Sequence, residues 1–306
     1  MARFPNVGLG EFYSETFAQA IGCDWGNFPH VPRGQTLLMA ADFGGENKGQ
    51  AFETFAFLFF DIESNQAWLK AQPQLRVRCR LNSRRMAFKS LNDGIRRKAL
   101  VPFLKQADLI EGILVVFAIS AGKNSLFDRS ADGEELLRFW KPHVQEKLMR
   151  VLHLSALFCS ALSVPGQDFL WFVDEDAIAA NDALLFELTN IFSRLASNYL
   201  FHDLRHLKCG TSKSDNEDLQ LEDIISISDL AAGALAEITT QMTVEQLFPR
   251  KGIITPLPAS LTWKSRLIGS WLANPGLKLQ RRIFILELHD RGSRLSHLGF
   301  RPTSLV

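Results

Sequence analysis

The segment Thr36–Asp42 (TLLMAAD) is a short apolar run that ends in an acid, and Phe169–Asp174 (FLWFVD) has the same form. Continuous apolar runs of this length predict β-strands that other elements cover on both faces, as in a parallel or mixed α/β sheet. In open α/β sheets, ligands bind beyond the carboxyl ends of the strands. The two runs therefore predict a sheet in which Asp42 and Asp174 gather at one edge.

A third acid lies within a predicted helix, in the segment Ile225–Leu235 (ISISDLAAGAL). With 3.6 residues per turn, Ile225, Asp229, Ala232 and Ala236 share one face. An unpaired charge in an apolar stripe is costly, so Asp229 needs a partner or a metal. The small residues that follow Asp229 would let this helix approach a sheet closely.

Three acids gathered at one sheet edge would repel one another unless a cation lay between them. The sequence therefore predicts a Mg²⁺ or Mn²⁺ site held by Asp42, Asp174 and Asp229, with Glu222 and Asp223 as possible additional ligands. Ordinary structural roles remain open for the same residues. Asp42 could cap a turn, Asp174 could cap the helix that follows it, and Asp229 could form a salt bridge with a basic residue of 76–98.

The net charge of +1 hides a strongly basic segment between Arg76 and Lys98, where Asp93 is the only acid. Such a segment suits the phosphate backbone of a nucleic acid, although a run of charges is often only a solvated face. We predict that Lys89 neutralises a phosphate near the metal. The residues expected to contact nucleic acid are Arg84, Arg85, Lys89, Arg96 and Arg97.

The order of the predicted elements indicates a ribonuclease-H-like α/β fold with helices on both sides of a mixed sheet. A three-strand antiparallel meander (37–41, 52–61 and 75–81) is expected first, followed by alternating helices and strands. The helices are predicted at 91–107, 134–162 (interrupted or restarted at Pro142), 181–200 (capped by Asn181) and 221–239, and the intervening strands at 113–120, 169–173 and 204–209. We expect an N-terminal arm (1–35), this domain (36–240) and a C-terminal extension (241–306) that packs on the same domain and holds a strand at 282–288.

Several functional classes are disfavoured by composition. The four cysteines are far apart with no CxxC spacing, so neither a zinc ribbon nor a disulfide scaffold is indicated. His202 and His206 have the spacing of two metal ligands on a helix, but the segment is predicted as a strand. No apolar run reaches the ~18 residues of a membrane span, and the first residues do not resemble a signal peptide. We expect a cytoplasmic protein without a membrane partner.

The motifs of residues 36–240 resemble the domain-of-unknown-function family 3800, a branch of the ribonuclease-H-like superfamily. The segment Asp42–Gly45 (DFGG) is similar to the family's opening Asp-Glu-Ser-Gly motif, with Phe43 in place of the glutamate. Phe88-Lys89, Phe172–Asp174 and Ile227–Ala234 resemble the later motifs in the same order. The resemblance implies a metal-dependent nuclease, in a family similar to proteins linked with mobile elements and phage defence.

The same opening motif is also similar to the first phosphate motif of sugar kinases, which share the superfold, but the second glycine-rich turn and the adenosine loop of that family are absent from the sequence. Three hypotheses follow. The first is a metal-dependent nuclease of ribonuclease-H type acting on DNA or RNA. The second is a non-catalytic module that binds nucleic acid, a partner protein or a second copy of this chain, and the third is an ATP-using kinase.

Overall fold

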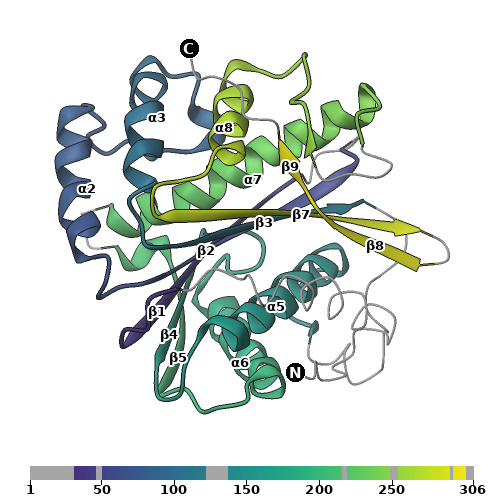
Figure 1. Ribbon diagram of the computed structural model, residues 1–306. Helices are drawn as coiled ribbons and strands as arrows, with labels where there is room; N and C mark the ends of the chain where they lie inside the picture. The colour runs from purple at the N-terminus through teal and green to yellow at the C-terminus, as the bar shows by residue number, and fades with distance from the viewer. Residues whose placement is uncertain are drawn as a thin grey trace.

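The computed structural model describes residues 31–45, 50–121, 137–215, 219–248, 254–289 and 292–300. Its centre is a seven-stranded mixed sheet (Figure 1). The strands of this sheet are β1 (Thr36–Gly44), β2 (Phe52–Asp61), β3 (Gly112–Ser120), β4 (Asp168–Val173), β5 (His206–Thr211), β7 (Leu279–His289) and β8 (Gly292–His297). Two further short strands, β6 (Ile254–Thr255) and β9 (Gly299–Phe300), pair with each other.

The strands lie in the order β5-β4-β1-β2-β3-β7-β8. Strands β1, β2 and β3 form an antiparallel meander, and β4 and β5 add in parallel beside β1. This is the ribonuclease-H-like arrangement that the sequence predicts, and the fold class is confirmed. Beyond the meander, β7 pairs in parallel with β3, and β8 pairs antiparallel with β7.

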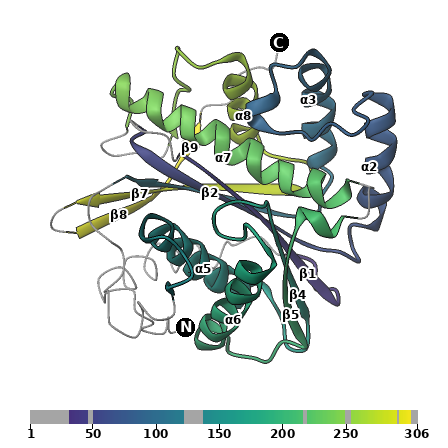
Figure 2. The same ribbon diagram turned by 180° about the vertical axis from the view of Figure 1, so that it is seen from behind.

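Helices cover both faces of the sheet (Figures 1 and 2). One layer contains α2 (Gln66–Arg78), α3 (Gly94–Ala107), α7 (Gln220–Val244) and α8 (Trp263–Ala273), and the other contains α5 (Pro142–Leu162) and α6 (Asp182–Tyr199). Alternate residues of β1 point into the two cores: Leu38 and Ala40 pack on the α7 side, and Leu37 and Met39 on the α5 side. Because both faces are covered, the central strands are apolar at nearly every position.

The strand predicted at 75–81 is wrong, because most of this segment belongs to helix α2. The third strand of the meander is β3, which the sequence analysis placed later in the fold. The inward face of α2 consists of Trp68, Gln72, Leu75 and Arg76, which have helical spacing. Two of these four residues are polar, so the helical stripe is not visible as an apolar pattern, and the alternation of arginines with apolar residues imitates a strand.

Most other predicted elements have counterparts in the structure. Asn181 caps α6, since its side chain accepts a hydrogen bond from the backbone N–H of Leu184. The predicted C-terminal strand corresponds to β7, whereas α8 had no counterpart in the prediction. The described part of the long helix begins afresh at Pro142, and its predicted start at Glu134 lies outside the described residues, as does most of the N-terminal arm. Within the described segments, no helix is both long and apolar enough to span a bilayer.

Helix α7 packs closely across β1, β2 and β3. The Ser228 hydroxyl donates to the carbonyl of Ala40 on β1 at 2.9 Å, and the Thr54 hydroxyl of β2 donates to the carbonyl of Ala232 at 2.9 Å. The absence of a side chain on Gly44 allows this approach, because a Cβ there would lie 2.9 Å from Oγ1 of Thr54, the atom that donates to Ala232. The position of every group on the inner face of α7 is thereby fixed relative to the sheet.

We expect Thr54→Val to reduce the free energy of unfolding by about 1 kcal/mol, because valine has the shape of threonine but cannot donate to Ala232. Equilibrium urea unfolding measures the loss. Thr243→Val is the matched control, since among the described residues the Thr243 hydroxyl donates within α7, to the carbonyl of Thr239. Equal losses in the two variants would contradict a role for Thr54 in holding α7 on the sheet.

Candidate functional site

Asp42 and Asp174 lie side by side at the carboxyl ends of two neighbouring strands. In the parallel pairing of β1 with β4, Ala41 is opposite Val173, so the residues that follow them are adjacent. Asp174 is held by two donors, the Ser212 hydroxyl at 3.3 Å and the backbone N–H of Glu175 at 2.8 Å. The sheet register thus brings together the two acids that end the apolar runs.

Asp229 of α7 completes this group from above the sheet. Its side chain forms a hydrogen bond with the side chain of Asp42, and both residues are partly buried. Each carboxyl group also accepts one backbone N–H: Asp42 from Phe43 at 2.6 Å, and Asp229 from Phe88 at 2.5 Å. We name Asp42 and Asp229 the carboxyl pair.

The carboxyl pair resists ionisation. Burial first, and then the charge of Asp229, raise the pKa of Asp42 well above its ordinary value, and Asp174 adds to the effect. Burial also raises the pKa of Asp229, against the opposing effects of the Phe88 N–H and the charge of Lys89. A proton shared by the two carboxyl groups relieves their repulsion, and a metal cation can replace that proton.

The donor set suits a hard cation with few protein ligands. Among the residues that the structure describes, no three His, Cys, Asp or Glu side chains are arranged to hold one ion. Mg²⁺ is commonly bound through one or two carboxylates, with water and substrate phosphate completing its octahedral shell. The carboxyl pair fits that kind of site, and Asp174 lies close enough to influence the charge of both members.

Glu222 and Asp223, predicted as additional ligands, lie on α7 but have protein partners. Glu222 forms an ion pair with Arg85 at 2.7 Å, although its pKa also responds to the charge of Asp174. Asp223 is fully buried and accepts hydrogen bonds from Arg76 and Gln72, each at 2.7 Å. The structure therefore gives Asp223 an internal ion pair in place of the predicted metal contact.

The ion pair of Asp223 organises the loop that reaches the site. Besides pairing with Asp223, the guanidinium of Arg76 donates to the carbonyls of Asn82 and Arg84. This loop leads into the short helix η2 (Phe88–Ser90), which supplies the backbone donor to Asp229. The sequence analysis missed the Phe88 N–H, because a backbone donor 141 positions from its acceptor leaves no local signal.

The basic residues predicted to contact nucleic acid divide into two groups. Arg84 and Arg96 both pair with Asp93, and Arg85 pairs with Glu222. Lys89 and Arg97 are exposed and form no ion pair with a described residue; Lys89 lies near Asp229, and the Arg97 guanidinium stacks on Trp263.

His202 and His206 are not part of the site. His202 interacts with the Ser163 hydroxyl at 2.9 Å, and His206 interacts at 2.9 Å with Asp168, which begins β4 and therefore lies at the opposite end of the sheet from Asp174.

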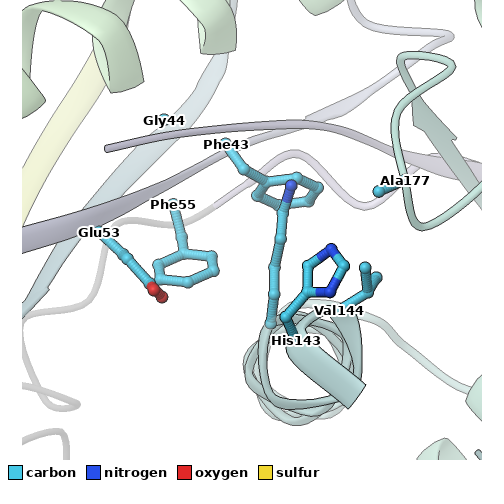
Figure 3. Close-up of a pocket in the computed structure, with 8 residues that line it drawn as sticks. Phe43, Gly44, Glu53, Phe55, His143, Val144 and Ala177 are labelled. Carbon is cyan, nitrogen blue, oxygen red and sulfur yellow. The ribbon is translucent and has the colours of Figure 1, made fainter. Parts of the chain in front are cut away.

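A cavity of about 300 Å³ lies behind the site, on the α5 face of β1. Figure 3 shows Phe43, Phe55 and His143 facing it. The charged side chains in its wall have protein partners: Lys147 pairs with Asp176 at 2.7 Å, and Glu53 pairs with Arg150 at 3.0 Å. Strand β1 separates this cavity from the carboxyl pair, because Phe43 and Asp42 project to opposite faces of the sheet.

Comparisons with known proteins give distant similarities only. No family model matches the chain, and no curated protein matches it. Among solved structures, it is similar to a Bst ribonuclease HIII determined with Mn²⁺, at 16% identity and a TM-score of 0.32, covering 72% of this chain and 58% of that one. It is also similar to ribonuclease H2 from Pyrococcus horikoshii OT3, at 13% identity and a TM-score of 0.30, covering 76% of this chain and 96% of that one. The fold assignment therefore rests on the strand order and directions of the sheet.

We expect Asp42→Asn to stabilise the metal-free protein near neutral pH. A carboxyl group whose pKa is raised by folding favours the folded state only while it is protonated, so its contribution is lost as pH rises through the raised pKa. The variant should therefore unfold at higher urea than the parent near pH 7. The difference should shrink as pH falls toward the ordinary aspartate pKa of about 4, where the parent carries the proton. If the difference in unfolding between Asp42→Asn and the parent stayed the same from pH 7 to about pH 4, repulsion between Asp42 and Asp229 would not be its cause.

We expect Asp223→Asn to reduce the free energy of unfolding by about 3–5 kcal/mol, because it leaves the buried Arg76 guanidinium without a counter-charge. Urea unfolding at pH 7 measures the loss. The control is Asp93→Asn, which removes a solvent-screened partner of Arg84 and Arg96 and should change the free energy of unfolding far less. A loss for Asp223→Asn no larger than that of the control would show that the buried pair is not a stabilising element.

Proposed function

We propose that this protein is a divalent-metal-dependent nuclease of ribonuclease-H type, which hydrolyses phosphodiester bonds. The observation that carries the proposal is the direct contact between Asp42 and Asp229 at the carboxyl edge of the sheet, beside Asp174. Maintaining two partly buried carboxyl groups in contact opposes folding at neutral pH. Such an arrangement is typical of a functional site rather than of structural packing.

In this proposal, Asp42 and Asp229 hold Mg²⁺ or Mn²⁺ together. A bound divalent ion would neutralise charge on the phosphodiester and lower the pKa of the attacking water. The Phe88 N–H donates to one oxygen of Asp229, and the Phe43 N–H donates to one oxygen of Asp42, so both carboxylates that would hold the cation are fixed by the backbone. The backbone donors thus orient the ligands before substrate arrives.

Asp174 and Lys89 take the remaining roles. Asp174 is anchored by Ser212 and by the Glu175 N–H, and we assign it to bind the second cation position or to accept the proton of the attacking water. Lys89 is exposed on η2 near Asp229, and its ammonium group offsets the negative charge of an approaching phosphate. Glu222, already paired with Arg85, is kept as an outer acid that borders Asp174.

Cleavage assays test this proposal. Labelled single-stranded DNA, duplex DNA, RNA and RNA–DNA hybrid are incubated with the protein in Mg²⁺, Mn²⁺ or EDTA. We expect cleavage of at least one substrate with either metal and none in EDTA. Asp42→Asn and Asp229→Asn should each reduce the rate by about a hundredfold or more, because each removes an anionic ligand of the ion.

The control variant is Asp203→Asn, which removes an exposed carboxylate just before β5, at the other end of the sheet, and should cleave at the parent rate. Metal-dependent cleavage that survives Asp42→Asn would exclude the carboxyl pair as the active site. Binding of nucleic acid by the parent without cleavage in either metal would exclude a nuclease and favour a non-catalytic binding module.

A further inference from the structure

Most cations near the carboxyl pair are neutralised within the protein. Three arginines of the loop and of α3 form ion pairs with acids, as described above, and a fourth, Arg76, is buried against Asp223. Charges compensated in this way contribute little to binding of an external anion. The cations that remain without an acidic partner among the described residues identify where such an anion would bind.

One of these uncompensated cations, Lys264, comes from α8, which the sequence analysis did not predict. The Lys264 ammonium group donates to the carbonyl of Phe88 at 3.0 Å and lies 4.0 Å from the centre of the Phe88 ring. The N–H of the same residue donates to Asp229. Phe88 therefore connects Lys264 to Asp229, since its carbonyl binds the lysine and its N–H binds the aspartate. Lys89 is the next residue in the chain after Phe88.

A second uncompensated cation continues outward from Lys264. The guanidinium of Arg97, on α3, lies 4.6 Å from the centre of the ring of Trp263, the residue before Lys264. Helices α3 and α8 lie side by side on the α7 face of the sheet (Figures 1 and 2). Lys89 follows Phe88 in the chain, Lys264 contacts the Phe88 carbonyl and ring, and Arg97 contacts the residue before Lys264. We name Lys89, Lys264 and Arg97 the cation track.

The position of α8 is fixed by α7. The Glu237 carboxylate accepts the backbone N–H of Thr262 at 2.7 Å and the hydroxyls of Thr262 and Ser265 at 3.0 and 2.7 Å. These bonds hold the first turn of α8, which carries Trp263 and Lys264. The Phe88 ring lies against Gly233 of α7. A Cβ at Gly233 would lie 2.5 Å from the ring, so only glycine leaves room for Phe88 there. One helix therefore positions Asp229, Phe88 and the first turn of α8 together.

We propose that the cation track binds successive phosphates of a nucleic acid strand and leads that strand to the carboxyl pair. Delivery of the strand to a cleavage site rests on the proposed function, but binding of the strand by the cation track does not require cleavage. Two of its three cations are held in place by aromatic rings, so less side-chain freedom is lost when a phosphate binds. The repeated negative charge of a polynucleotide matches a row of fixed cations.

Binding is measured by fluorescence anisotropy in EDTA, with labelled single-stranded and duplex DNA and RNA, over a series of KCl concentrations. All proteins carry Asp42→Asn, so that no substrate is cut. Each phosphate contact contributes about 0.7 (single strand) to 0.9 (duplex) to the slope of log K against log salt. We expect Lys89→Ala, Arg97→Ala and Lys264→Ala each to reduce the slope by about one contact, and the triple variant to lose about three.

Two further variants separate the charge of Lys264 from its structural contact. Lys264→Gln can still donate to the Phe88 carbonyl but carries no charge, and it should show the same reduced slope as Lys264→Ala. Lys264→Arg should restore the parent slope. The matched control is Arg266→Ala on the same helix, because Arg266 is exposed and donates to the carbonyl of Ala259; its slope should equal that of the parent.

The proposal would be overturned if Lys264→Ala had the same salt slope as the parent, or if Arg266→Ala lowered the salt slope as much as Lys264→Ala does. It would also be overturned if the parent bound no nucleic acid at low salt. Failure of the proposed function gives a different result. In that case the salt slopes would follow the cation track as expected, whereas the protein with Asp42 intact would cleave no substrate in Mg²⁺ or Mn²⁺.

Discussion

The close packing of α7 on the sheet is the constraint on which the site depends. Hydroxyl groups of Ser228 and Thr54 bridge the helix to β1 and β2, and Gly44 leaves room for the Thr54 hydroxyl. The same approach forces Asp229 against Asp42, so packing and charge repulsion arise from one geometry. The apolar contacts of α7 with both the sheet and α8 offset the repulsion, which is how a fold can retain an unfavourable pair of acids.

The strand register explains why the acids could be identified from the sequence. Asp42 and Asp174 each end a continuous apolar run, and a parallel pairing of the two runs leaves little freedom in where their last residues lie. Asp229 was visible because a charge interrupts an otherwise apolar helical face. The fold class followed from the same runs, since only strands covered on both faces are apolar at every position.

The parts that could not be predicted depend on long-range polar contacts. Helix α2 was mistaken for a strand because its inward residues Gln72 and Arg76 are polar, and their partner Asp223 lies 147 positions beyond Arg76. Which basic residues are neutralised also depends on distant acids. Arg85, for example, pairs with Glu222, and nothing in the sequence around Arg85 indicates that partner. Lys264 was missed for a similar reason, because its relation to the site runs through the backbone of Phe88.

The order of these elements along the chain has a kinetic consequence. Strands β1 to β5 precede α7, and they hold Asp42 in β1 and Asp174 directly after β4. During synthesis the sheet that positions these two acids can therefore pair before Asp229 exists as part of a helix. The repulsion between Asp42 and Asp229 then arises only when α7 packs on the sheet, late in folding. For the same reason, undocking of α7 relieves repulsion while leaving much of the sheet paired. Separation of α7 from the sheet should therefore become easier as pH rises through the raised pKa of the carboxyl pair, and exchange of the α7 amides would quicken with it beyond the intrinsic effect of pH.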